Sequence, residues 1–384
     1  MIYWKEYRFF GLRPQDDKVR SILIALLLFI SIPSFGCTSV IISSKCTKDG
    51  KAVMFKHRDT DHIDNRMQWF QGERYAFVGL VNADAGPAPK EVWSGANSAG
   101  FCIMNTATYD LKDDDVPASR MDREGIVMFR ALEICATVSD FEHLLDSLPR
   151  PMGVEANFGV IDAFGGAAYY EVNNHSWTKF DVNEEPGGYM VVTNFTRTGR
   201  PEDHRGVDRY ERASVLMEIL TKEADVQNGI THRELIGSIS RSGAPILRDI
   251  TSAVLVFEGV SAGSDPSHTV MWGCVGYPGT TAYVPMQVFG EGHLPSFVTA
   301  EAARDDHCYA SDTGLQWKGK EEDPAMKACL AGTERFIESK FLRLFKRKEK
   351  MSAAAYIAAY DRLMKRYERL YRKNFDKYKK ETAS

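Results

Sequence analysis

Cys37 is the residue from which the possible chemistry of this 384-residue chain starts. It follows Ser-Phe-Gly at positions 34–36, which places small side chains three and one positions before it. If the peptide bond between Gly36 and Cys37 is cut, Cys37 carries a thiol and a free α-amine on one residue. A nucleophile and a base are then held together covalently, and such a pair can break amide bonds through an acyl-enzyme intermediate.

The residues before Cys37 indicate how such a terminus could arise. Residues 21–32 form an unbroken apolar run, with Lys18 and Arg20 in front of it and Pro33 behind it. A basic segment, an apolar segment of about 7–15 residues and a small-x-small site are typical of a secretory signal peptide. The run is too short for a membrane-spanning helix, which takes roughly 20 residues. We therefore predict a signal peptide over residues 1–36 and an exported protein, periplasmic or secreted.

A lipid anchor is the second interpretation of the same stretch. A cysteine after an apolar segment is also the acylation site of a bacterial lipoprotein, and Cys37 would then only hold the protein at a membrane. Such sites usually carry an aliphatic residue three positions before the cysteine, where this chain has Ser34. Both interpretations stay open at this point.

Catalysis at Cys37 needs charged partners, and two candidates lie in the polar run KHRDTD, residues 56–61. The apolar segments 38–44 and 52–55 predict the two strands of a hairpin. A hairpin brings the end of its second strand beside the start of its first, so Arg58 and Asp61 can approach Cys37. Arg58 could favour the thiolate, and Asp61 could accept a hydrogen bond from the α-amine. A surface ion-pair cluster in a turn is the alternative interpretation.

Two asparagines could supply donors for the oxyanion of an amide-cleaving reaction. Asn105 follows the apolar segment 101–104, and Asn194 follows the segment 189–193. An asparagine in such a place can simply start a turn, or it can point its amide N–H into a site at the edge of a sheet. Arg209, at the start of a predicted helix, is by itself an ordinary helix charge.

The elements that would position these residues occur in alternating groups. Further strands are predicted over residues 75–81, 91–105 (two strands and a turn), 157–163, 167–172, 189–195, 251–257, 268–274 and 282–288. Helices are predicted over residues 123–138, 140–148, 207–223 and 231–240, the last with Thr231 and Glu234 as a capping box. Grouped strands and grouped helices favour a layered, mainly antiparallel α+β sandwich over a βαβ repeat.

From about Asp323 onward the strands stop and a basic helical segment begins. Residues 336–380 predict helix with one break near Ser352, and tyrosines and leucines recur at three-to-four-residue spacing after it. Such a face packs on the domain or on a partner chain, with a surface for an anionic membrane as the alternative. We predict a signal peptide (1–36), a main domain (37–322), a helical extension (323–384) and a homo-oligomer that could form through the C-terminal helices.

Composition limits the other function classes. The chain is 44% hydrophobic and 26% charged, which is ordinary for a globular protein, and its net charge of −4 gives no sign of a nucleic-acid partner. The six cysteines besides Cys37 could pair in an oxidising compartment. None lies in a CxxC or in a Cys/His spacing typical of zinc, so we expect no metal and no cofactor. Cys102 and Cys135 lie in apolar runs and are expected in the core.

Five blocks of the sequence together resemble one known superfamily. In order, they are CTSVIISSKCTKDGKAVMFKHRDTD, WSGANSAGFCIMNTATY, NFGVIDA, VVTNF and VDRYERAS, within roughly residues 37–288. This order resembles the N-terminal-nucleophile (Ntn) hydrolases of linear amides, which hold the acyl-CoA:isopenicillin-N acyltransferase-like proteins, the choloylglycine (bile salt) hydrolases and the penicillin V acylases. HRDTD and the GxNxxGFxIMNT-type block are most similar to the acyltransferase branch.

The resemblance implies a four-layer αββα sandwich and a cysteine amidohydrolase that cuts a C–N bond, with acyl transfer as a second outcome. By position, the family nucleophile falls on Cys37, its Arg and Asp on Arg58 and Asp61, its oxyanion-hole asparagines on Asn105 and Asn194, and its late active-site arginine on Arg209. The implied mechanism passes the acyl group to the Cys37 sulfur and then to water or another amine. In the acyltransferase the cysteine is freed by self-cleavage, whereas here a signal peptidase could suffice.

Two departures from the family pattern keep alternatives open. The first hairpin is longer than in the bile salt enzymes, so Arg58 and Asp61 could be out of register, and the basic helical tail lies outside the shared core. The opening also resembles the Ntn dipeptidases, which makes short peptides the main alternative substrates. From another class, a lipid-anchored binding protein without activity is the alternative. A papain-type protease is disfavoured because His57, His62, His175 and His204 lack a convincing partner context.

Overall fold

The computed structural model describes residues 36–47, 49–112, 115–223, 229–301 and 306–382. The predicted signal peptide lies outside these residues except for Gly36. The described residues from Gly36 onward form one compact unit. Within them, no helix has both the length and the apolar character needed to cross a membrane.

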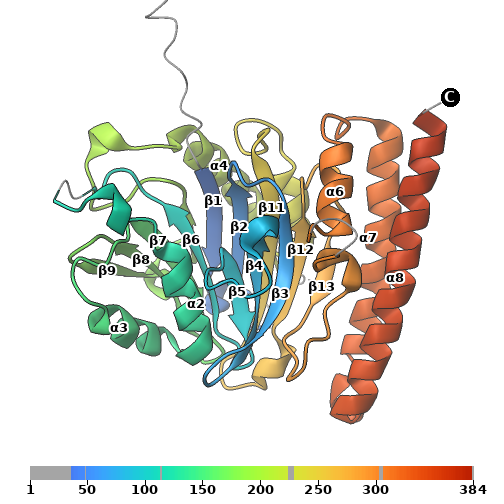
Figure 1. Cartoon of the computed structure of the whole chain (residues 1–384), viewed down its shortest axis with the longest axis horizontal. Helices are drawn as coiled ribbons and strands as arrows, with labels where there is room; N and C mark the ends of the chain where they lie inside the picture. Colours follow the sequence, from blue (N-terminus) through green and yellow to red (C-terminus); the bar gives the residue numbers. More distant parts are fainter. Residues whose placement is uncertain (1–35, 48, 113–114, 224–228, 302–305, 383–384) are drawn as a thin grey trace, which may run out of the picture. The chain divides into compact units, whose positions relative to one another are not determined.

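Two antiparallel sheets form the centre of this unit (Figure 1). Sheet A has the strand order β10-β1-β2-β11-β12-β13, and sheet B has the order β3-β4-β5-β6-β7-β8-β9. The strands of sheet A are β1 (Gly36–Ile42), β2 (Lys51–Asp59), β10 (Tyr189–Val192), β11 (Thr251–Ser261), β12 (Val270–Val275) and β13 (Val284–Met286). The strands of sheet B are β3 (Asn65–Gln71), β4 (Ala76–Asn82), β5 (Ser94–Asn97), β6 (Cys102–Ala107), β7 (Ala156–Ile161), β8 (Ala167–Val172) and β9 (Trp177–Asp181).

Helices cover the outer face of each sheet. On sheet B lie α2 (Glu124–Ile134) and α3 (Val138–Ser147), with the Phe129 ring 5.1 Å from that of Phe77 on β4. On sheet A, the Phe341 ring of α7 (Pro324–Phe345) lies 5.3 Å from that of Trp272 on β12. The helices beyond α3 are α4 (Val207–Glu223), α5 (His232–Glu234) with a π-helical continuation (Leu235–Ser240), α6 (Tyr309–Gln316), α7 (Pro324–Phe345) and α8 (Ala353–Thr382). The predicted four-layer αββα sandwich of the α+β class is confirmed.

The two sheets meet through the side chains that alternate along their strands. The β1–β2 register pairs Ser39 with Lys56 and Ile41 with Met54, so these side chains share one face of sheet A. On that face the hydroxyl of Tyr169, from β8 of sheet B, donates to Ser39 Oγ at 3.1 Å. Cys37 and its partner across the hairpin follow the same alternation, and they therefore point toward sheet B.

Strand β2 is longer than the sequence pattern predicts. The pattern ends the strand at residue 55 and assigns residues 56–61 to a polar turn, but the strand continues to Asp59. Residues 56–59 are buried because β1 and β11 flank the strand and other layers cover both of its faces. Arg58 therefore does not belong to a surface ion-pair cluster.

Most remaining elements follow the prediction with shifts of a few residues, and the Thr231–Glu234 capping box is present. Helix α7 begins at Pro324, well before the predicted start at residue 336. Strands β3 and β9 and helix α6 are not predicted by the sequence pattern. Strand β3 carries Arg66 and Gln68 among its apolar residues, and β9 at the sheet edge has Thr178 and Lys179 exposed, so neither shows a clear apolar run.

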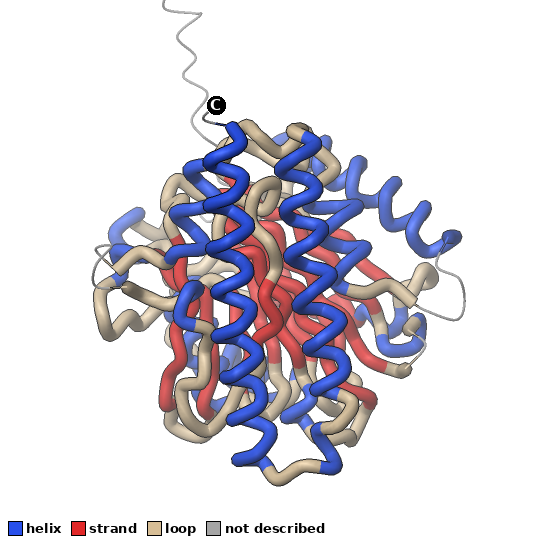
Figure 2. Tube along the Cα trace, turned by 90° about the vertical axis from the view of Figure 1, so that its right-hand side faces the viewer, coloured by secondary structure: helices blue, strands red, loops and turns tan. Residues whose placement is uncertain are grey.

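The C-terminal helices pack on the chain's own sheet (Figure 2). The break near Ser352 is confirmed, since α7 ends at Phe345 and α8 begins at Ala353. The buried face of α8 consists of Tyr356, Tyr360, Met364, Tyr367, Tyr371, Phe375 and Tyr378. The hydroxyls of Tyr360 and Tyr367 donate to main-chain carbonyls of β13 and the residue before it, at 2.9 and 2.8 Å. This face is used within the chain, and the homo-oligomer stays a prediction.

All seven cysteines are free thiols, so the disulfides that an exported chain permits are not formed. Cys102 and Cys135 are fully buried, which confirms their predicted place in the core. Burial raises the pKa of the Cys135 thiol to about 12. These two thiols are therefore packing residues, not nucleophiles.

Candidate active site

The β1–β2 hairpin sets the position of Cys37. Cys37 lies directly opposite Arg58, and Ser39 lies opposite Lys56. Directly paired residues in an antiparallel ladder present their side chains on the same face. Cys37, Arg58 and Lys56 therefore share the face turned toward sheet B, and the longer hairpin does not put Arg58 out of register with Cys37.

A cavity of about 500 Å³ is lined by Cys37. Among the six predicted site residues, the cavity is lined by Cys37, Arg58, Asp61, Asn105 and Asn194. These residues come from both sheets and from the loops at the ends of β2 and β10. Arg209 does not line the cavity; it lies on α4, behind the strand that carries Cys37.

The main chain of Cys37 is held by Asn194 and Arg209. The Cys37 N–H donates to Asn194 Oδ1 at 2.8 Å, and Arg209 Nη2 donates to the same oxygen at 2.6 Å. Arg209 Nη1 also donates to the carbonyl oxygen of Cys37. Burial lowers the pKa of Arg209, while Asp59 and Cys37 act in the opposite direction.

The Asn194 amide is oriented differently from what the resemblance implies. Its Nδ2 group donates to the carbonyl of Ala107 at 2.6 Å, and its oxygen faces two donors. The N–H that was expected to point at an oxyanion is therefore directed at Ala107. Asn194 instead presents an acceptor to the main-chain nitrogen of Cys37.

Asn105 presents the opposite end of its amide to the cavity. Lys56 Nζ donates to Asn105 Oδ1 at 2.9 Å and to the Asn105 main-chain oxygen. Because an ammonium only donates, the amide oxygen faces Lys56 and the NH₂ group is turned away. Within the described part of the chain this NH₂ group has no acceptor, and Asn105 lines the cavity.

Arg58 and Asp61 are both near Cys37 but differ in burial. Arg58 is 5% exposed, donates to Asn82 Oδ1 at 2.9 Å and to Asn65 Oδ1, and its guanidinium carbon lies 5.0 Å from the Trp93 ring centroid. Burial lowers the pKa of Arg58 to about 10, and the charges of Cys37 and Asp61 oppose this. The Asp61 side chain is 58% exposed, and among the described residues it makes no hydrogen bond to the Cys37 nitrogen.

A buried ionic network lies on the opposite face of β2. Asp59 accepts from Arg248 Nη2 and from Thr251 Oγ1, each at 2.7 Å, and it lies 3.3 Å from His57 Nε2. Burial alone would raise the pKa of Asp59, but His57 and Arg248 hold it below its ordinary value. A methyl group on Gly36 would lie 2.8 Å from Arg209 Nη2 and closer still to Arg248. A larger residue before Cys37 would therefore displace one or both of these guanidinium groups.

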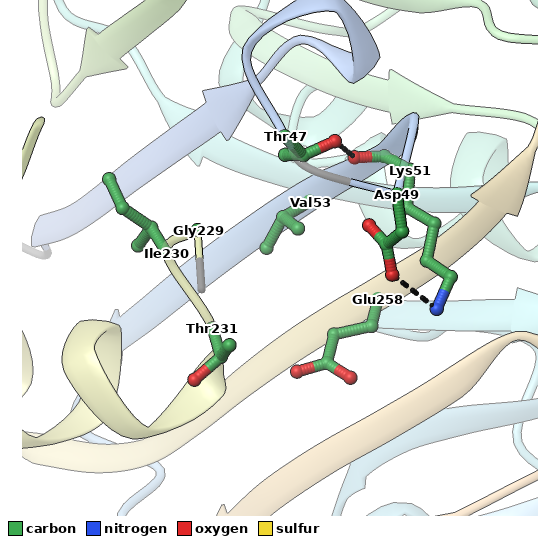
Figure 3. A pocket seen from close by; sticks show the side chains of 8 residues that line it. All are labelled: Thr47, Asp49, Lys51, Val53, Gly229, Ile230, Thr231 and Glu258. Atoms are coloured by element: carbon green, nitrogen blue, oxygen red, sulfur yellow. Dashed lines mark hydrogen bonds and ion pairs between the residues drawn. The ribbon is translucent and has the colours of Figure 1, made fainter. Parts of the chain in front are cut away.

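A second hollow lies at the other end of β2 and is smaller, about 120 Å³ (Figure 3). Its side chains include the ion pair Lys51–Asp49 at 2.6 Å and the Glu258 carboxylate. It contains no thiol. It therefore does not compete with the Cys37 cavity as a site for thiol chemistry.

A known protein family matches the part of the chain that holds most of the site residues. The model of the acyl-coenzyme A:6-aminopenicillanic acid acyl-transferase family matches residues 46–227. The predicted family resemblance is confirmed. So is the prediction that the chain is an enzyme, since this is a family of acyl-transferring enzymes. The matched range holds Arg58, Asp61, Asn105, Asn194 and Arg209 and begins after Cys37. No curated protein sequence matches the chain.

Three similar solved structures are amide hydrolases. An N-acylethanolamine-hydrolyzing acid amidase ortholog from Caenorhabditis elegans is 15% identical, with a TM-score of 0.45 over 57% of this chain and 92% of the other. The conjugated bile acid hydrolase of Clostridium perfringens is 12% identical, with a TM-score of 0.43 over 67% and 93%. Penicillin V acylase from Agrobacterium tumefaciens is 15% identical, with a TM-score of 0.41 over 66% and 86%.

Lys56 is the residue of this site that sequence reasoning missed. It is 2% exposed and lies beside the Cys37 thiol. Burial lowers the pKa of Lys56, and Arg58 adds to this, while Cys37 raises it. A signal was present in the sequence, because Lys56 and Arg58 are two residues apart and share a face if the strand continues through them. The assignment of residues 56–61 to a turn hid it.

Proposed function

We propose that the protein is an exported cysteine Ntn amidohydrolase that cleaves a linear amide through a thioester on Cys37. The proposal rests on the residues that surround Cys37. Of the seven cysteines it is the one that lines the large cavity, with Arg58 opposite it and Lys56 beside it. Cationic groups next to the sulfur favour the reactive thiolate.

Removal of residues 1–36, by a signal peptidase or by self-cleavage, would turn the Cys37 main-chain nitrogen into an amine held by Asn194 Oδ1. That amine takes the thiol proton, directly or through a water. The sulfur attacks the amide carbonyl carbon, a C–S bond forms, and the carbonyl electron pair moves to the oxygen. Asn105 donates its amide N–H to this oxyanion, an interaction that can contribute about 3–4 kcal/mol in such sites.

Collapse of the tetrahedral intermediate breaks the C–N bond. The leaving nitrogen takes the proton from the Cys37 ammonium, and the acyl group stays on sulfur as a thioester. Water then attacks the thioester and restores the thiol; an amine in place of water would give acyl transfer. Arg209 holds the Cys37 carbonyl and the Asn194 oxygen in place from the other side of the strand.

Substitution of Cys37 tests the proposal directly. Cys37→Ala should abolish turnover of N-acyl amides while the circular dichroism spectrum and melting temperature stay those of the unchanged protein. Cys46→Ala, at an exposed cysteine outside the cavity, is the matched control and should keep full activity. Full turnover by Cys37→Ala would refute the assignment.

Short peptides with a free ammonium group are the second candidate substrates. Six acidic residues line the cavity, against the two basic residues Lys56 and Arg58; the acidic residues are Asp59, Asp61, Glu91, Asp122, Glu124 and Glu155. This excess of negative charge favours a substrate that carries a positive charge. Comparing kcat/KM for dipeptides with that for the same dipeptides acylated at their nitrogen decides between the candidates. A preference for the acylated form would leave N-acyl amides as the substrates.

The state of the terminus separates the enzyme from the lipid-anchored alternative. We propose that the exported protein begins with an unmodified Cys37. The intact mass of the protein purified from the periplasm or medium should equal that of residues 37–384. A mass increased by a diacylglyceryl group would identify Cys37 as an anchor, and the catalytic proposal would then fall.

A further inference from the structure

Lys56 carries a buried positive charge, and the groups that stabilise this charge have to be identified. The side chain is on the central strand β2, and the residue is 2% exposed. A buried ammonium is costly unless an anion or several acceptors surround it. Nζ has three donors, and two of them go to the Asn105 main-chain and side-chain oxygens, which are neutral.

No carboxylate of the described residues forms an ion pair with Lys56. Among the groups that act on it electrostatically, Cys37 comes first as a partner and Asp59, on the same strand, comes last. Asp59 is already bound by Arg248 and Thr251 on the opposite face. The group that can complete the surroundings of the ammonium is therefore the sulfur of Cys37 in its anionic form.

We propose that Lys56 is a catalytic residue, the counter-ion of the Cys37 thiolate, and that it also strengthens Asn105 as the oxyanion donor. This inference rests on the proposed function, in which Cys37 is the nucleophile. The thiol proton passes to the amine of the processed terminus or to water. The sulfur then holds one negative charge beside the ammonium, and no bond forms between them.

The same ammonium serves the next step of the reaction. When sulfur attacks the carbonyl carbon, the negative charge moves from sulfur to the carbonyl oxygen. Lys56 already donates to Asn105 Oδ1 at 2.9 Å. A donor on the amide oxygen polarises the amide and makes its N–H a stronger donor to that oxygen. Lys56 thus stabilises the negative charge on sulfur and strengthens the donor to the carbonyl oxygen, which receives that charge.

The other charged groups around Cys37 bind other partners or carry the wrong sign of charge to stabilise a thiolate. Arg58, opposite Cys37, directs its guanidinium to Asn65 and Asn82 and lies against Trp93. Arg209 acts from α4 on the main chain of Cys37. The acidic residues of the cavity wall offer no cation that could replace Lys56; they are Asp59, Asp61, Glu91, Asp122, Glu124 and Glu155. Removing Lys56 should therefore shift the balance toward the neutral thiol.

Alkylation of Cys37 tests this without any substrate. The rate of iodoacetamide modification is followed against pH by mass spectrometry of the Cys37 peptide, in the mature protein with Cys46→Ser. An opposite charge within about 4–6 Å changes the ionisation of a group by about one to three pH units. Lys56→Met should therefore react at least about tenfold more slowly at pH 7 and approach the unchanged protein above about pH 10. Lys51→Met, at the partly exposed start of the same strand, is the control and should leave the profile unchanged.

A folded Lys56→Met protein with an unchanged alkylation profile would overturn the inference. Lys56→Arg keeps the charge and should react at nearly the original rate. If Lys56→Met does not fold, Lys56→Arg decides: a folded Lys56→Arg protein that alkylates tenfold more slowly at pH 7 contradicts the counter-ion role. The result is separable from the proposed function, since an unchanged profile beside an inactive Cys37→Ala protein removes only the role of Lys56.

Discussion

Ionisable side chains in the cavity are buried to different degrees, and Glu124 is the acid whose ionisation burial changes most clearly. It lies in the first turn of α2, is 8% exposed and accepts a hydrogen bond from the Glu155 N–H at 3.0 Å. Burial raises the pKa of Glu124 from 4.5 to about 7; the hydrogen bonds act against this, and Asp122 and Glu155 add to it. The carboxylate is thus close to half-protonated in neutral solution.

This raised pKa predicts how stability depends on pH. The stability that Glu124 contributes is fully present below pH 4.5 and is lost as the pH rises through about 7, because the charged form is disfavoured in the folded state. Glu124→Gln keeps an oxygen for the Glu155 N–H and cannot ionise. We expect this variant to be more stable than the unchanged protein at pH 8, by about 3 kcal/mol, and equally stable at pH 4.5.

Urea unfolding at the two pH values measures this difference. Glu211→Gln, on the exposed side of α4, is the control and should leave the difference between the two pH values unchanged. A Glu124→Gln protein that is no more stable than the original at pH 8 would show that the carboxylate is better solvated than its burial indicates.

Site residues differ in how far the sequence could predict them. A hairpin that begins at Cys37 brings Arg58 near it by strand pairing alone, and this local geometry is what the sequence contains. Which end of the Asn194 amide faces Cys37 depends on Arg209 and Ala107, which are far away in the chain. The burial of Lys56 depends on sheet B, which packs over it. The orientation of the Asn194 amide and the burial of Lys56 are set by contacts between segments that are distant in the sequence. A local sequence pattern does not predict such contacts.

At the scale of elements, the spacing of apolar residues predicted most strands and helices. It predicted less well the parts of strands that carry polar or charged residues. Strand β2 was cut short at residue 55 because charged residues usually mark a surface, whereas here both faces of the strand are covered. Helix α8 was predicted well, since its aromatic residues recur at helical spacing and its polar residues face outward. What the sequence left undecided was the surface on which this face packs.

The packing of α8 on sheet A predicts a large contribution to stability from single residues. Tyr360 is fully buried, its hydroxyl donates to the Pro285 carbonyl at 2.9 Å, and its ring lies 5.2 Å from that of Phe289. Tyr360→Ala should cost about 3–5 kcal/mol of unfolding free energy, and Tyr360→Phe about 1–3 kcal/mol through the unpaired carbonyl.

Chemical denaturation of these variants provides the measurement. Arg362→Ala, on the exposed side of the same helix, should stay within about 0.5 kcal/mol of the original. If Tyr360→Ala were as stable as Arg362→Ala, helix α8 would not be an integral part of the domain in solution.

At the scale of the whole molecule, the candidate site exists only because two sheets stack at one separation. Cys37 and Lys56 belong to sheet A, and Asn105 belongs to β6 of sheet B. The sheets approach closely at Gly159 on β7. A methyl group there would lie 3.2 Å from Ile41 Cδ1 of sheet A and 3.1 Å from Tyr169 Cε1, and it would overlap the end of Met104, the neighbour of Asn105.

A larger side chain at this point should therefore move Asn105 relative to Cys37 without touching the cavity. Gly159→Val should cost about 1–3 kcal/mol through overpacking. It should also lower kcat at least about tenfold, because a displacement of about 1 Å can cost a reacting group as much as a hundredfold in rate. Gly237→Ala, at a glycine whose added methyl would meet nothing within 4 Å, is the matched control and should change neither quantity. A folded, destabilised Gly159→Val protein with full kcat would mean that the spacing of the sheets does not set the geometry of the reacting groups.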